Sequence, residues 1–598
     1  MNFDKYSGTL QPMRHVFLGF IFSPLLLSAL AYQVKFIGID NSECLRAIKD
    51  ASSLVTLQDR PPPSLNGLRY RAESDMPAIE KTVRAFAYYD AEISYEIRSR
   101  QDPVQVIVTI RNQGPYKLGS YSVFHETTCK EPLELSDCCA LTLDQLGLKL
   151  GKPAWSVNIV NAELQVLTQL AKCGYPLAFI DKRKVEVDSE QKEVNAAVCV
   201  QEGPYAKFGP SVLFGLKEVN PRFIERRIGW TEGETYNSEL LAQTQKRFMR
   251  TDLFSSVYIS HGSELDQLGE LPMQVRFTES KHKQLSLGAY YATADGFGGS
   301  FAWVNRNLRG MGETLAIKGD VSTRSRAGEM TYKKLDFLGP DQIYRATAGL
   351  SRQRIHPYIA LIYGLGNYFD KTIDDKRFLS IGVEAEHYKV TRSATNGTYA
   401  LIGLPVIMRY DTSNDPLNPT TGYTLVLQEI PYQTIIHSSH RFIKQRFTST
   451  FYIPLNPTRW AVLALRAQFG SIAGTKRKNV PLPLLFLGGT EDNLRGYRYM
   501  SVSPLNHNNQ SLGGRSAIFT SAELRFRFGD FGVVPFADFG TVTSGELPEL
   551  NAKWFKSVGL GVRYFAFFGP LRLDVGFPLD KRKFDPVFRV YASVGQSF

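Results

Sequence analysis

The stretch that decides the fold is Ala522-Glu523-Leu524-Arg525-Phe526-Arg527-Phe528, in which apolar and polar side chains alternate. Successive side chains of a β-strand point to opposite faces, so one face of this segment is apolar and the other is charged. The same alternation recurs at 284–291, 558–564 and 571–577. An apolar face backed by a polar face is typical of transmembrane strands, which separate lipid from a wet lumen.

The C-terminal half is long enough for a complete barrel. Residues 281–598 comprise 318 residues, which at roughly 20 residues per strand and connection allow about 16 strands. A soluble β-sandwich would show the same alternation. Two features favour the barrel: the export signal at the N-terminus, described below, and the lack of a second break in composition within the C-terminal half. We therefore predict a mainly β protein whose C-terminal domain is a transmembrane antiparallel β-barrel.

The amino-acid composition limits the classes of partner that this chain is expected to bind. The chain has 598 residues, a net charge of +12 and 43% hydrophobic residues, which excludes a helical-bundle membrane protein. Lysine and arginine are dispersed, and no basic run is interleaved with base-stacking aromatics. A lipid bilayer is therefore an expected partner, and nucleic acid is not.

The N-terminus reads as an export signal. Arg14 and His15 precede an apolar run at 16–27, and Ala29-Leu30-Ala31 supplies the small residues of a cleavage site. A single membrane anchor is the alternative, but the run is shorter than about 20 residues. We expect residues 1–31 to be a signal peptide.

All six cysteines precede residue 200, and export implies an oxidising compartment. No metal-ligand spacing is present, because Cys138 and Cys139 are adjacent and no histidine pair lies nearby. We expect one or two disulfides and no metal site, with the connectivity open. The cysteines are Cys44, Cys129, Cys138, Cys139, Cys173 and Cys199.

An internal repeat divides the first half. A strand-like run at 106–110 leads into Gly114-Pro115-Tyr116, and a second run at 197–200 leads into Gly203-Pro204-Tyr205, 89 residues later. A repeat of this size indicates tandem small domains. Each is expected to open with a strand, pass through helix and close with two strands.

These domains resemble a known family. Residues 69–75 and 83–91 resemble the helix pair of the first POTRA domain in TamA-like outer-membrane proteins, with Ala87 where the family usually has glycine. Residues 236–257 are similar to a third such domain. The resemblance implies three α+β POTRA domains in the periplasm, at 32–114, 115–203 and 204–280, before a barrel at 281–598.

A long connection carries the sharpest motif. Within the Gly-, Asn-, Pro- and Ser-rich segment 484–516, the tripeptide Arg495-Gly496-Tyr497 resembles the tip of the sixth extracellular loop in the BamA/TamA superfamily, where the loop folds back into the lumen. A guanidinium there needs carboxylate partners. Glu523 and Asp538 match the family's acidic lumen positions.

Two further segments match the family. One resembles a turn motif between strands, for which we expect a structural role: Asp415, Pro416, Asn418, Pro419 and Gly422. The other resembles the outer-membrane β-signal of a last strand. Its apolar residues are expected on one face of that strand, with Gly595 beside them: Phe588, Val590, Ala592, Val594 and Phe598.

The resemblance implies a TamA-like factor in the outer membrane that inserts or exports client proteins. Clients would use a weak seam between the first strand, with Leu285, Leu287 and Gly288, and the last strand. It also implies a TamB-like, inner-membrane-anchored partner that docks on the POTRA domains by strand addition.

Two alternatives remain open: a BamA-like core insertase, which usually has five POTRA domains, and a passive channel or two-partner secretion pore, which usually has two. No catalytic residue or cofactor is expected, because the sequence lacks a Gly-x-Ser-x-Gly elbow, a His-Glu-x-x-His motif and a phosphate loop.

Overall fold

The computed structural model describes residues 30–125, 131–132, 142–292, 296–436, 439–566 and 569–598. The expected signal sequence, up to residue 29, lies outside them. Among the described residues, no helix combines the length and the apolar character needed to cross a membrane. The chain divides into two compact units. The first comprises residues 1–209, 232–239 and 263–271, and the second comprises the remainder, to Phe598.

The first small domain is a three-stranded sheet with helices α1 (Ser42–Ala51), α2 (Ser53–Thr56) and α3 (Leu65–Ala85). The sheet order is β1 (Tyr32–Ile37), β3 (Val104–Arg111), β2 (Glu92–Arg98), with β1 parallel and β2 antiparallel to the central strand. Helix α1 begins where the Asn41 side chain accepts hydrogen bonds from the amides of Glu43 and Cys44.

The second domain has the same plan, and the part of it that the structure describes contains one α-helix, α4 (Ser156–Lys172), over the sheet. Ile159, Val166 and Leu170 recur at helical spacing and are buried. The sheet order is β5 (Glu131–Pro132), β4 (Lys117–His125), β7 (Glu193–Gln201), β6 (Phe179–Asp188). Strand β4 runs parallel to β7, and β6 runs antiparallel to it.

The third domain contains helices α5 (Pro221–Glu225) and α6 (Ser238–Met249). Its sheet order is β8 (Lys207–Phe214), β10 (Glu270–Glu279), β9 (Phe254–His261). In all three domains the closing strand therefore lies between the opening strand and its hairpin partner. The prediction of three α+β domains that open with a strand and close with two is confirmed.

The cysteines follow the expectation where they can be seen. Cys44 is a buried free thiol, and burial raises its pKa to about 11. Cys173 and Cys199 are disulfide-bonded. Cys129, Cys138 and Cys139 lie outside the described residues.

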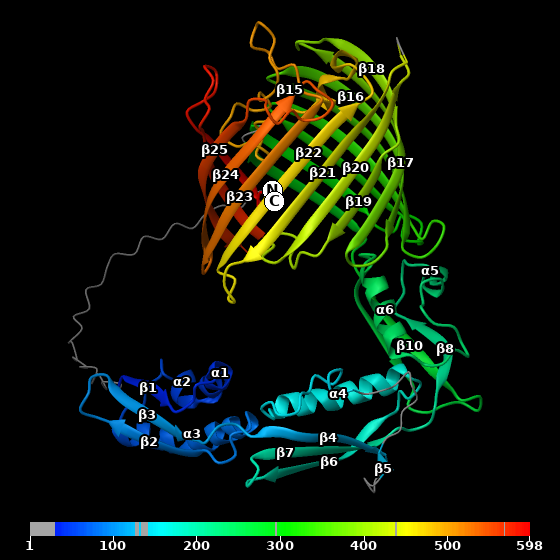
Figure 1. The fold of residues 1–598 in the computed structure, drawn as a ribbon. Helices are drawn as coiled ribbons and strands as arrows, with labels where there is room; N and C mark the ends of the chain where they lie inside the picture. Colours follow the sequence, from blue (N-terminus) through cyan, green and yellow to red (C-terminus); the bar gives the residue numbers. More distant parts are fainter. Residues whose placement is uncertain (1–29, 126–130, 133–141, 293–295, 437–438, 567–568) are drawn as a thin grey trace, which may run out of the picture. The chain divides into compact units, whose positions relative to one another are not determined.

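The C-terminal domain is one antiparallel sheet that curves into a barrel (Figure 1). Both β18 and β19 pair with β17 and with β20, so they share one strand position that is interrupted near Pro405. The seventeen strands of the described sheet thus fill sixteen positions, as predicted. In order they are β11 (Lys283–Ala292), β12 (Gly296–Asn305), β13 (Thr314–Ser322), β14 (Ser325–Leu335), β15 (Gln342–Ile355), β16 (Tyr358–Thr372), β17 (Arg377–Thr391), β18 (Gly397–Gly403), β19 (Val406–Asp411), β20 (Gly422–Thr434), β21 (Arg441–Pro454), β22 (Ala461–Ala473), β23 (Ser516–Phe528), β24 (Phe531–Thr543), β25 (Phe555–Ala566), β26 (Gly569–Pro578) and β27 (Arg589–Val594).

The two faces of the sheet have the predicted character. On β23, Glu523 is fully buried in the lumen, whereas Leu524 is 38% exposed on the outer surface. The outer surface carries apolar side chains on the first strand and on the last hairpins, including Leu285, Leu287, Val558, Leu560, Leu571 and Leu573.

The third domain contacts the barrel within the second unit. The Arg227 guanidinium is buried and donates to both carboxylate oxygens of Asp336, which follows β14. Glu279, the last residue of β10, accepts hydrogen bonds from the amides of Lys217, Glu218 and Val219. These contacts fix the end of the third domain next to the start of β11.

The last strand differs from the prediction. β27 covers only Arg589–Val594, so Phe588 precedes it. The backbone of Gly595 has φ of 93°, a left-handed conformation that ends the strand. Phe598 therefore does not share a strand face with Val590, and the expected strand to the C-terminus is wrong in its last four residues.

Candidate functional site

The connection between β22 and β23 folds into the lumen as a plug, defined here as residues 474–515. It includes two short 3-10 helices, η2 (Arg477–Asn479) and η3 (Leu482–Leu484), and backbone bridges that join Phe486 to Gly514 and Gly488 to Val502. The prediction began this segment ten residues too late. Apolar residues two apart, such as Val480, Leu482 and Leu484, imitate a strand in the sequence.

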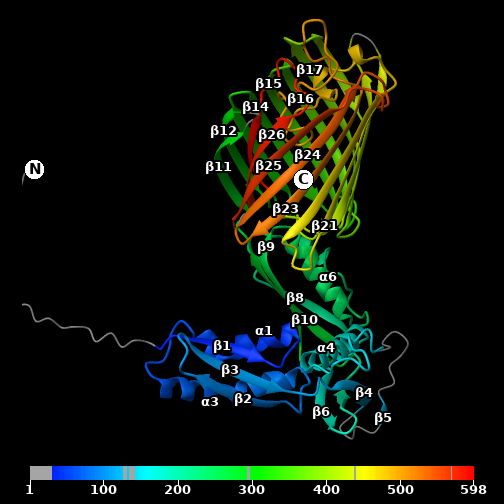
Figure 2. The ribbon, with the colours of Figure 1, turned by 60° about the vertical axis from the view of Figure 1, so that its left-hand side comes forward.

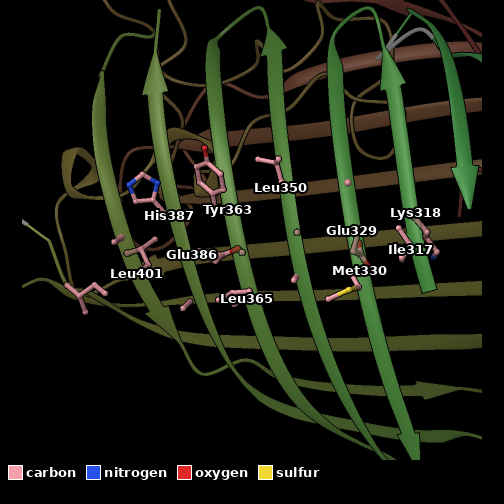
Figure 3. Close-up of a pocket in the computed structure, with 17 residues that line it drawn as sticks. Ile317, Lys318, Glu329, Met330, Leu350, Tyr363, Leu365, Glu386, His387 and Leu401 are labelled. Carbon is pink, nitrogen blue, oxygen red and sulfur yellow. The ribbon is translucent and has the colours of Figure 1, made fainter. Parts of the chain in front are cut away.

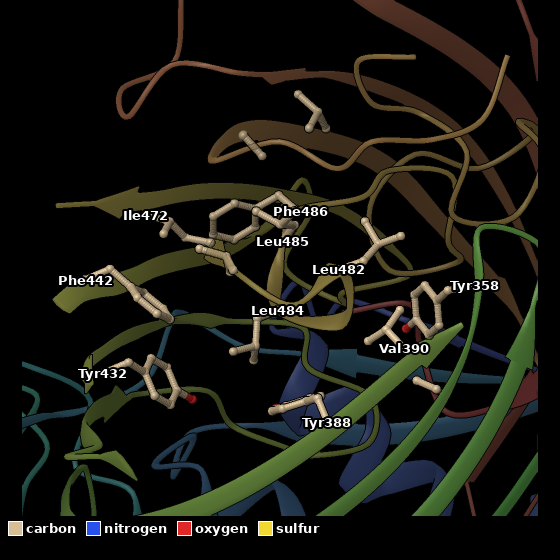
Figure 4. Close-up of a cluster of buried hydrophobic side chains, with 14 of the residues drawn as sticks. Tyr358, Tyr388, Val390, Tyr432, Phe442, Ile472, Leu482, Leu484, Leu485 and Phe486 are labelled. Atoms are coloured by element: carbon tan, nitrogen blue, oxygen red, sulfur yellow. The ribbon is translucent and has the colours of Figure 1, made fainter. Parts of the chain in front are cut away.

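Apolar side chains hold the plug against the inner wall (Figure 4). Leu482, Leu484 and Phe486 belong to a buried cluster with wall residues such as Tyr432 and Phe442. Burying each such side chain contributes about 1.5–3 kcal/mol. The plug is therefore a packed part of the barrel domain.

Arg495 lies at the tip of the plug and is 1% exposed. Its Nε and Nη2 donate to the two oxygens of Asp538, each at 2.8 Å, and its Nη1 donates to Glu523 at 2.8 Å and to Asp574 at 3.0 Å. The guanidinium carbon also lies 3.4 Å from the centre of the Phe536 ring. The structure thus brings Arg495 together with both carboxylates that the sequence singled out.

Three strands supply the carboxylates. Glu523 is on β23, Asp538 is on the neighbouring β24, and Asp574 is on β26. Asp574 also accepts a hydrogen bond from Arg563 at 2.5 Å, and Glu523 accepts one from Arg525 at 3.0 Å. Sequence reasoning missed Asp574, although its alternation with Leu571 and Leu573 placed it on the lumen face.

Gly496 and Tyr497 complete the tip. Gly496 has φ of 91°, and a Cβ there would lie 3.1 Å from the carbonyl carbon of Gly576. Its amide donates to the Tyr591 hydroxyl at 2.8 Å. The Tyr497 hydroxyl donates to the carbonyl of Lys556 at 2.7 Å. The close approach of backbone to backbone explains why a glycine stands here.

The C-terminal tail, residues 595–598, reaches the same cluster. The Ser597 hydroxyl donates to Glu523 at 2.5 Å, and the Arg525 guanidinium donates to the Phe598 carbonyl at 2.7 Å. The Phe598 ring lies beneath two guanidinium carbons, Arg466 at 4.6 Å and Arg525 at 5.2 Å. The tail is thus held in the lumen by charged groups of β22 and β23.

The predicted turn lies between β19 and β20. Asp415 accepts hydrogen bonds from the amides of Leu417 and Asn418 at 2.8 and 2.9 Å, and Gly422 begins β20 with φ of 97°. The Asn418 side chain also accepts a hydrogen bond from Gln596 at 3.0 Å. The turn therefore contacts the tail as well. The turn residues are Asp415, Pro416, Asn418, Pro419 and Gly422.

The first and last strands meet at the seam, defined here as the boundary between β11 and β27. The two strands are neighbours, and Figure 2 shows β11 on the same side of the barrel as β25 and β26. Within the described residues, the sheet order begins at β11 and ends at β27 with no hydrogen-bonded ladder between them. Ten residues of β11 face a strand of six.

The outer surface has an apolar depression over strands β13 to β18, with a volume of about 760 Å³ (Figure 3). Exposed side chains around it include Leu350, Tyr363 and Leu365. Glu329 and Glu386 also border it, but they alternate with outward-facing residues and belong to the lumen face. The depression therefore faces away from the plug.

Comparison with known proteins finds a family model for the C-terminal half and relatives that match most of the chain. Residues 307–598 match the model of the Omp85 superfamily domain. An outer membrane protein assembly factor BamA from Nitratidesulfovibrio vulgaris is 22% identical over 530 residues, covering 85% of this chain. A BamA from Neorickettsia risticii is 21% identical over 563 residues, covering 89% of this chain and 73% of that protein.

The first of these relatives is the longer protein, since the match spans 65% of its length. Among solved structures, BamA from Haemophilus ducreyi lacking POTRA domains 1–3 superposes with a TM-score of 0.64 at 17% identity. That match covers 80% of this chain and 100% of the other. With its sixteen strand positions, lumen plug and α+β domains, the chain is an outer-membrane β-barrel protein whose N-terminal domains lie in the periplasm, and its residues 307–598 are similar to the Omp85 superfamily domain.

Proposed function

We propose that this protein assembles other proteins into or across the outer membrane, and that the seam is its working element. The observation that carries the proposal is the missing hydrogen-bond ladder between β11 and β27 among the described residues. Unpaired backbone groups cost several kcal/mol each in lipid, so a closed barrel normally pairs all of its strands. An unpaired edge is a template for another strand.

Two features keep that edge available. β27 is four residues shorter than β11, and the chain leaves the seam at Gly595. The tail is held in the lumen by Arg525, Arg466 and Glu523 instead of continuing along β11. A client strand can therefore add to β11 without first displacing a full-length partner strand.

We assign the Arg495 cluster a positioning role. It ties the plug to β23, β24 and β26, the strands that precede the seam, and through Glu523 to the tail. Since each carboxylate already accepts from a guanidinium, we propose no catalytic role and no cofactor for these groups.

A reversible cross-link across the seam tests the proposal. Cysteine pairs that join Leu285 or Leu287 to Val590 or Ala592, in a background without the native cysteines, should leave the barrel inserted. They should abolish client assembly until reductant is added. The matched control joins Ser286 to Ala302, which are directly opposite on β11 and β12. That pair stays together whether or not the seam opens, so its cross-link should leave assembly intact.

A fully cross-linked seam that still supports assembly would overturn the mechanism. A passive channel or a two-partner secretion pore would then be the better account. If the cross-linked protein instead keeps its ion conductance but loses client assembly, the seam and not the lumen is the working element.

Within this function we propose a TamA-like factor, on the resemblance of the helix pair at 69–91 and of the loop tip, with a BamA-like core insertase as the alternative. A TamB-like partner would add a strand to the second domain, where β6 pairs only with β7 among the described strands and is exposed along most of its length. Copurification of a long periplasmic protein, abolished by a proline at Val185 in β6, would support this; binding that survives the change would contradict it.

A further inference from the structure

The lumen contains a cavity of about 380 Å³ between strands β21 and β22 and the plug. Three basic side chains line it, Lys444 and Arg446 of β21 and Arg466 of β22, together with the single carboxylate of Asp492. Lys444 and Arg446 are two residues apart and alternate with outward-facing residues, so both side chains face the lumen.

Two of these cations lack hydrogen-bond partners. Within the described residues, neither the Lys444 ammonium nor the Arg446 guanidinium donates a hydrogen bond to the protein. Both lie over the Phe486 ring, at 5.8 and 6.0 Å from its centre. A Cβ at Gly470 would collide with that ring at 2.4 Å, so the absence of a side chain at Gly470 leaves room for Phe486 beside the two cations.

Nearby acids are engaged elsewhere. Glu384 accepts hydrogen bonds from the hydroxyls of Tyr368 and Tyr432, and Glu386 accepts one from Tyr388. Neither carboxylate belongs to the lining of the cavity. Arg466 donates to backbone carbonyls of Ser597 and Asp492, which carry no net charge.

We propose that this cavity binds a phosphoryl group through Lys444, Arg446 and Arg466. Among the side chains that line the cavity, three are cationic and one is a carboxylate, and a phosphate monoester carries about −1.5 to −2 charges at neutral pH. Its three terminal oxygens suit donors that converge from several directions, whereas a carboxylate offers two oxygens in one plane. The cavity is larger than one phosphate, and Phe519 and Leu487 give it an apolar side, so a phosphate ester with an apolar substituent also fits.

The ligand can be free phosphate or the phosphate of a lipid headgroup, and the shared phosphoryl chemistry is what the site recognises. This inference is independent of the proposed assembly function, because it rests on charges in the plug-lined cavity and not on the seam.

Isothermal titration of the purified full-length protein, in a non-ionic detergent at low salt, tests the site. The probes are inorganic phosphate, short-chain phosphatidic acid and, as a zwitterionic reference, short-chain phosphatidylcholine. Wild-type protein should bind at least one of the two phosphate monoester probes saturably at constant ionic strength. Arg446→Gln and Lys444→Gln should each weaken binding about tenfold or more, since each removes a charge-assisted hydrogen bond.

Arg441→Gln is the matched control, because Arg441 is on the same strand but exposed on the opposite face. Binding of inorganic phosphate alone identifies the free anion as the ligand, and binding of phosphatidic acid alone identifies a lipid headgroup. The proposal is overturned by no saturable binding of either, by equal binding of phosphatidylcholine, or by the same loss in Arg441→Gln. Heat-modifiability of each variant verifies that its barrel is folded, and an unfolded Arg446→Gln is replaced by Arg446→Lys, which should weaken binding less than Lys444→Gln does.

Discussion

Arg495 and Asp538 form a two-point ion pair in which Nε and Nη2 donate to the two carboxylate oxygens at 2.8 Å each, and neither residue exposes more than 1% of its surface. The plug and the barrel wall therefore meet at a charge pair that water does not reach. Breaking a buried pair by removing one partner leaves the other charge uncompensated and costs about 3–5 kcal/mol.

We expect Arg495→Ala to impair client assembly while the barrel still inserts. Asp538 is affected most, because Glu523 retains Arg525 and Asp574 retains Arg563. Arg495→Lys should restore little, since an ammonium cannot donate in the two-point geometry. Heat-modifiability and client assembly measured on the same membranes report the two effects separately. Arg352→Ala, at an exposed position on β15, is the control, and unchanged assembly in Arg495→Ala would contradict the expectation.

Gly496→Ala should loosen the tip. Its Cβ would meet Gly576 and Pro578 at 3.0–3.1 Å, and the φ of 91° disfavours a side chain. Overpacking of this kind costs typically about 1–3 kcal/mol. The urea midpoint for unfolding in detergent should fall accordingly.

Gly529→Ala separates the two causes of that loss. Gly529 also has a positive φ, 61°, but no atom lies within 4 Å of the added Cβ. It should therefore show the backbone strain without the collision and lose less stability than Gly496→Ala. Equal losses would mean that the contact with Gly576 is unimportant.

The sequence foretold the parts of the fold that depend on alternation. Leu524 and Glu523 occupy the predicted faces because each lies in a long, regular strand with lipid on one side. Ala87 stands where the resemblance leads us to expect a helix-ending glycine, and its backbone has φ of 67°. Ala87 therefore adopts the left-handed conformation although it is not a glycine.

Other features follow from tertiary contacts that no local pattern records. The alternating apolar residues from Phe588 to Phe598 fit a strand. The strand nevertheless ends at Gly595, which has a left-handed backbone, and the hydrogen bond from Arg525 to the Phe598 carbonyl holds the tail in the lumen. The sequence places Lys444 and Arg446 on the polar face of a strand, but it does not show that they line a cavity together with residues of the plug.

The end of the third domain should loosen in acid. Burial raises the pKa of Glu279, but hydrogen bonds from three backbone amides and from His282 outweigh it, so the pKa lies below its usual value. Because the pKa of Glu279 is lower in the folded protein, its carboxylate contributes fully to stability at pH values above the ordinary pKa of about 4.3. This stabilisation is lost as the pH falls through the pKa of the folded state.

Hydrogen exchange of the Lys217, Glu218 and Val219 amides checks whether stability falls, as predicted, when the pH is lowered. After correction for the intrinsic rate, their protection should be constant from neutral pH to about pH 5 and decrease at lower pH. Glu279→Gln should reduce their protection already at neutral pH, and Glu264→Gln, at an exposed position, should not. Protection that rises on acidification would contradict the assignment.

The last prediction concerns the tail. Phe598→Ala removes the ring that lies 4.6 Å from Arg466 and 5.2 Å from Arg525, contacts of about 0.5–2 kcal/mol each. The alanine variant keeps the backbone carbonyl that Arg525 binds, so the tail should loosen without leaving the lumen altogether.

Because β27 has no ladder to β11, we expect faster hydrogen exchange of its amides at 589–594 than of those in β23. Phe588→Ala is the control, since Phe588 is exposed and contacts only Phe577 among aromatic rings of the described chain. If both variants speed exchange in β27 equally, the ring of Phe598 does not secure the strand, and the hydrogen bonds of Ser597 and Arg525 must do so alone.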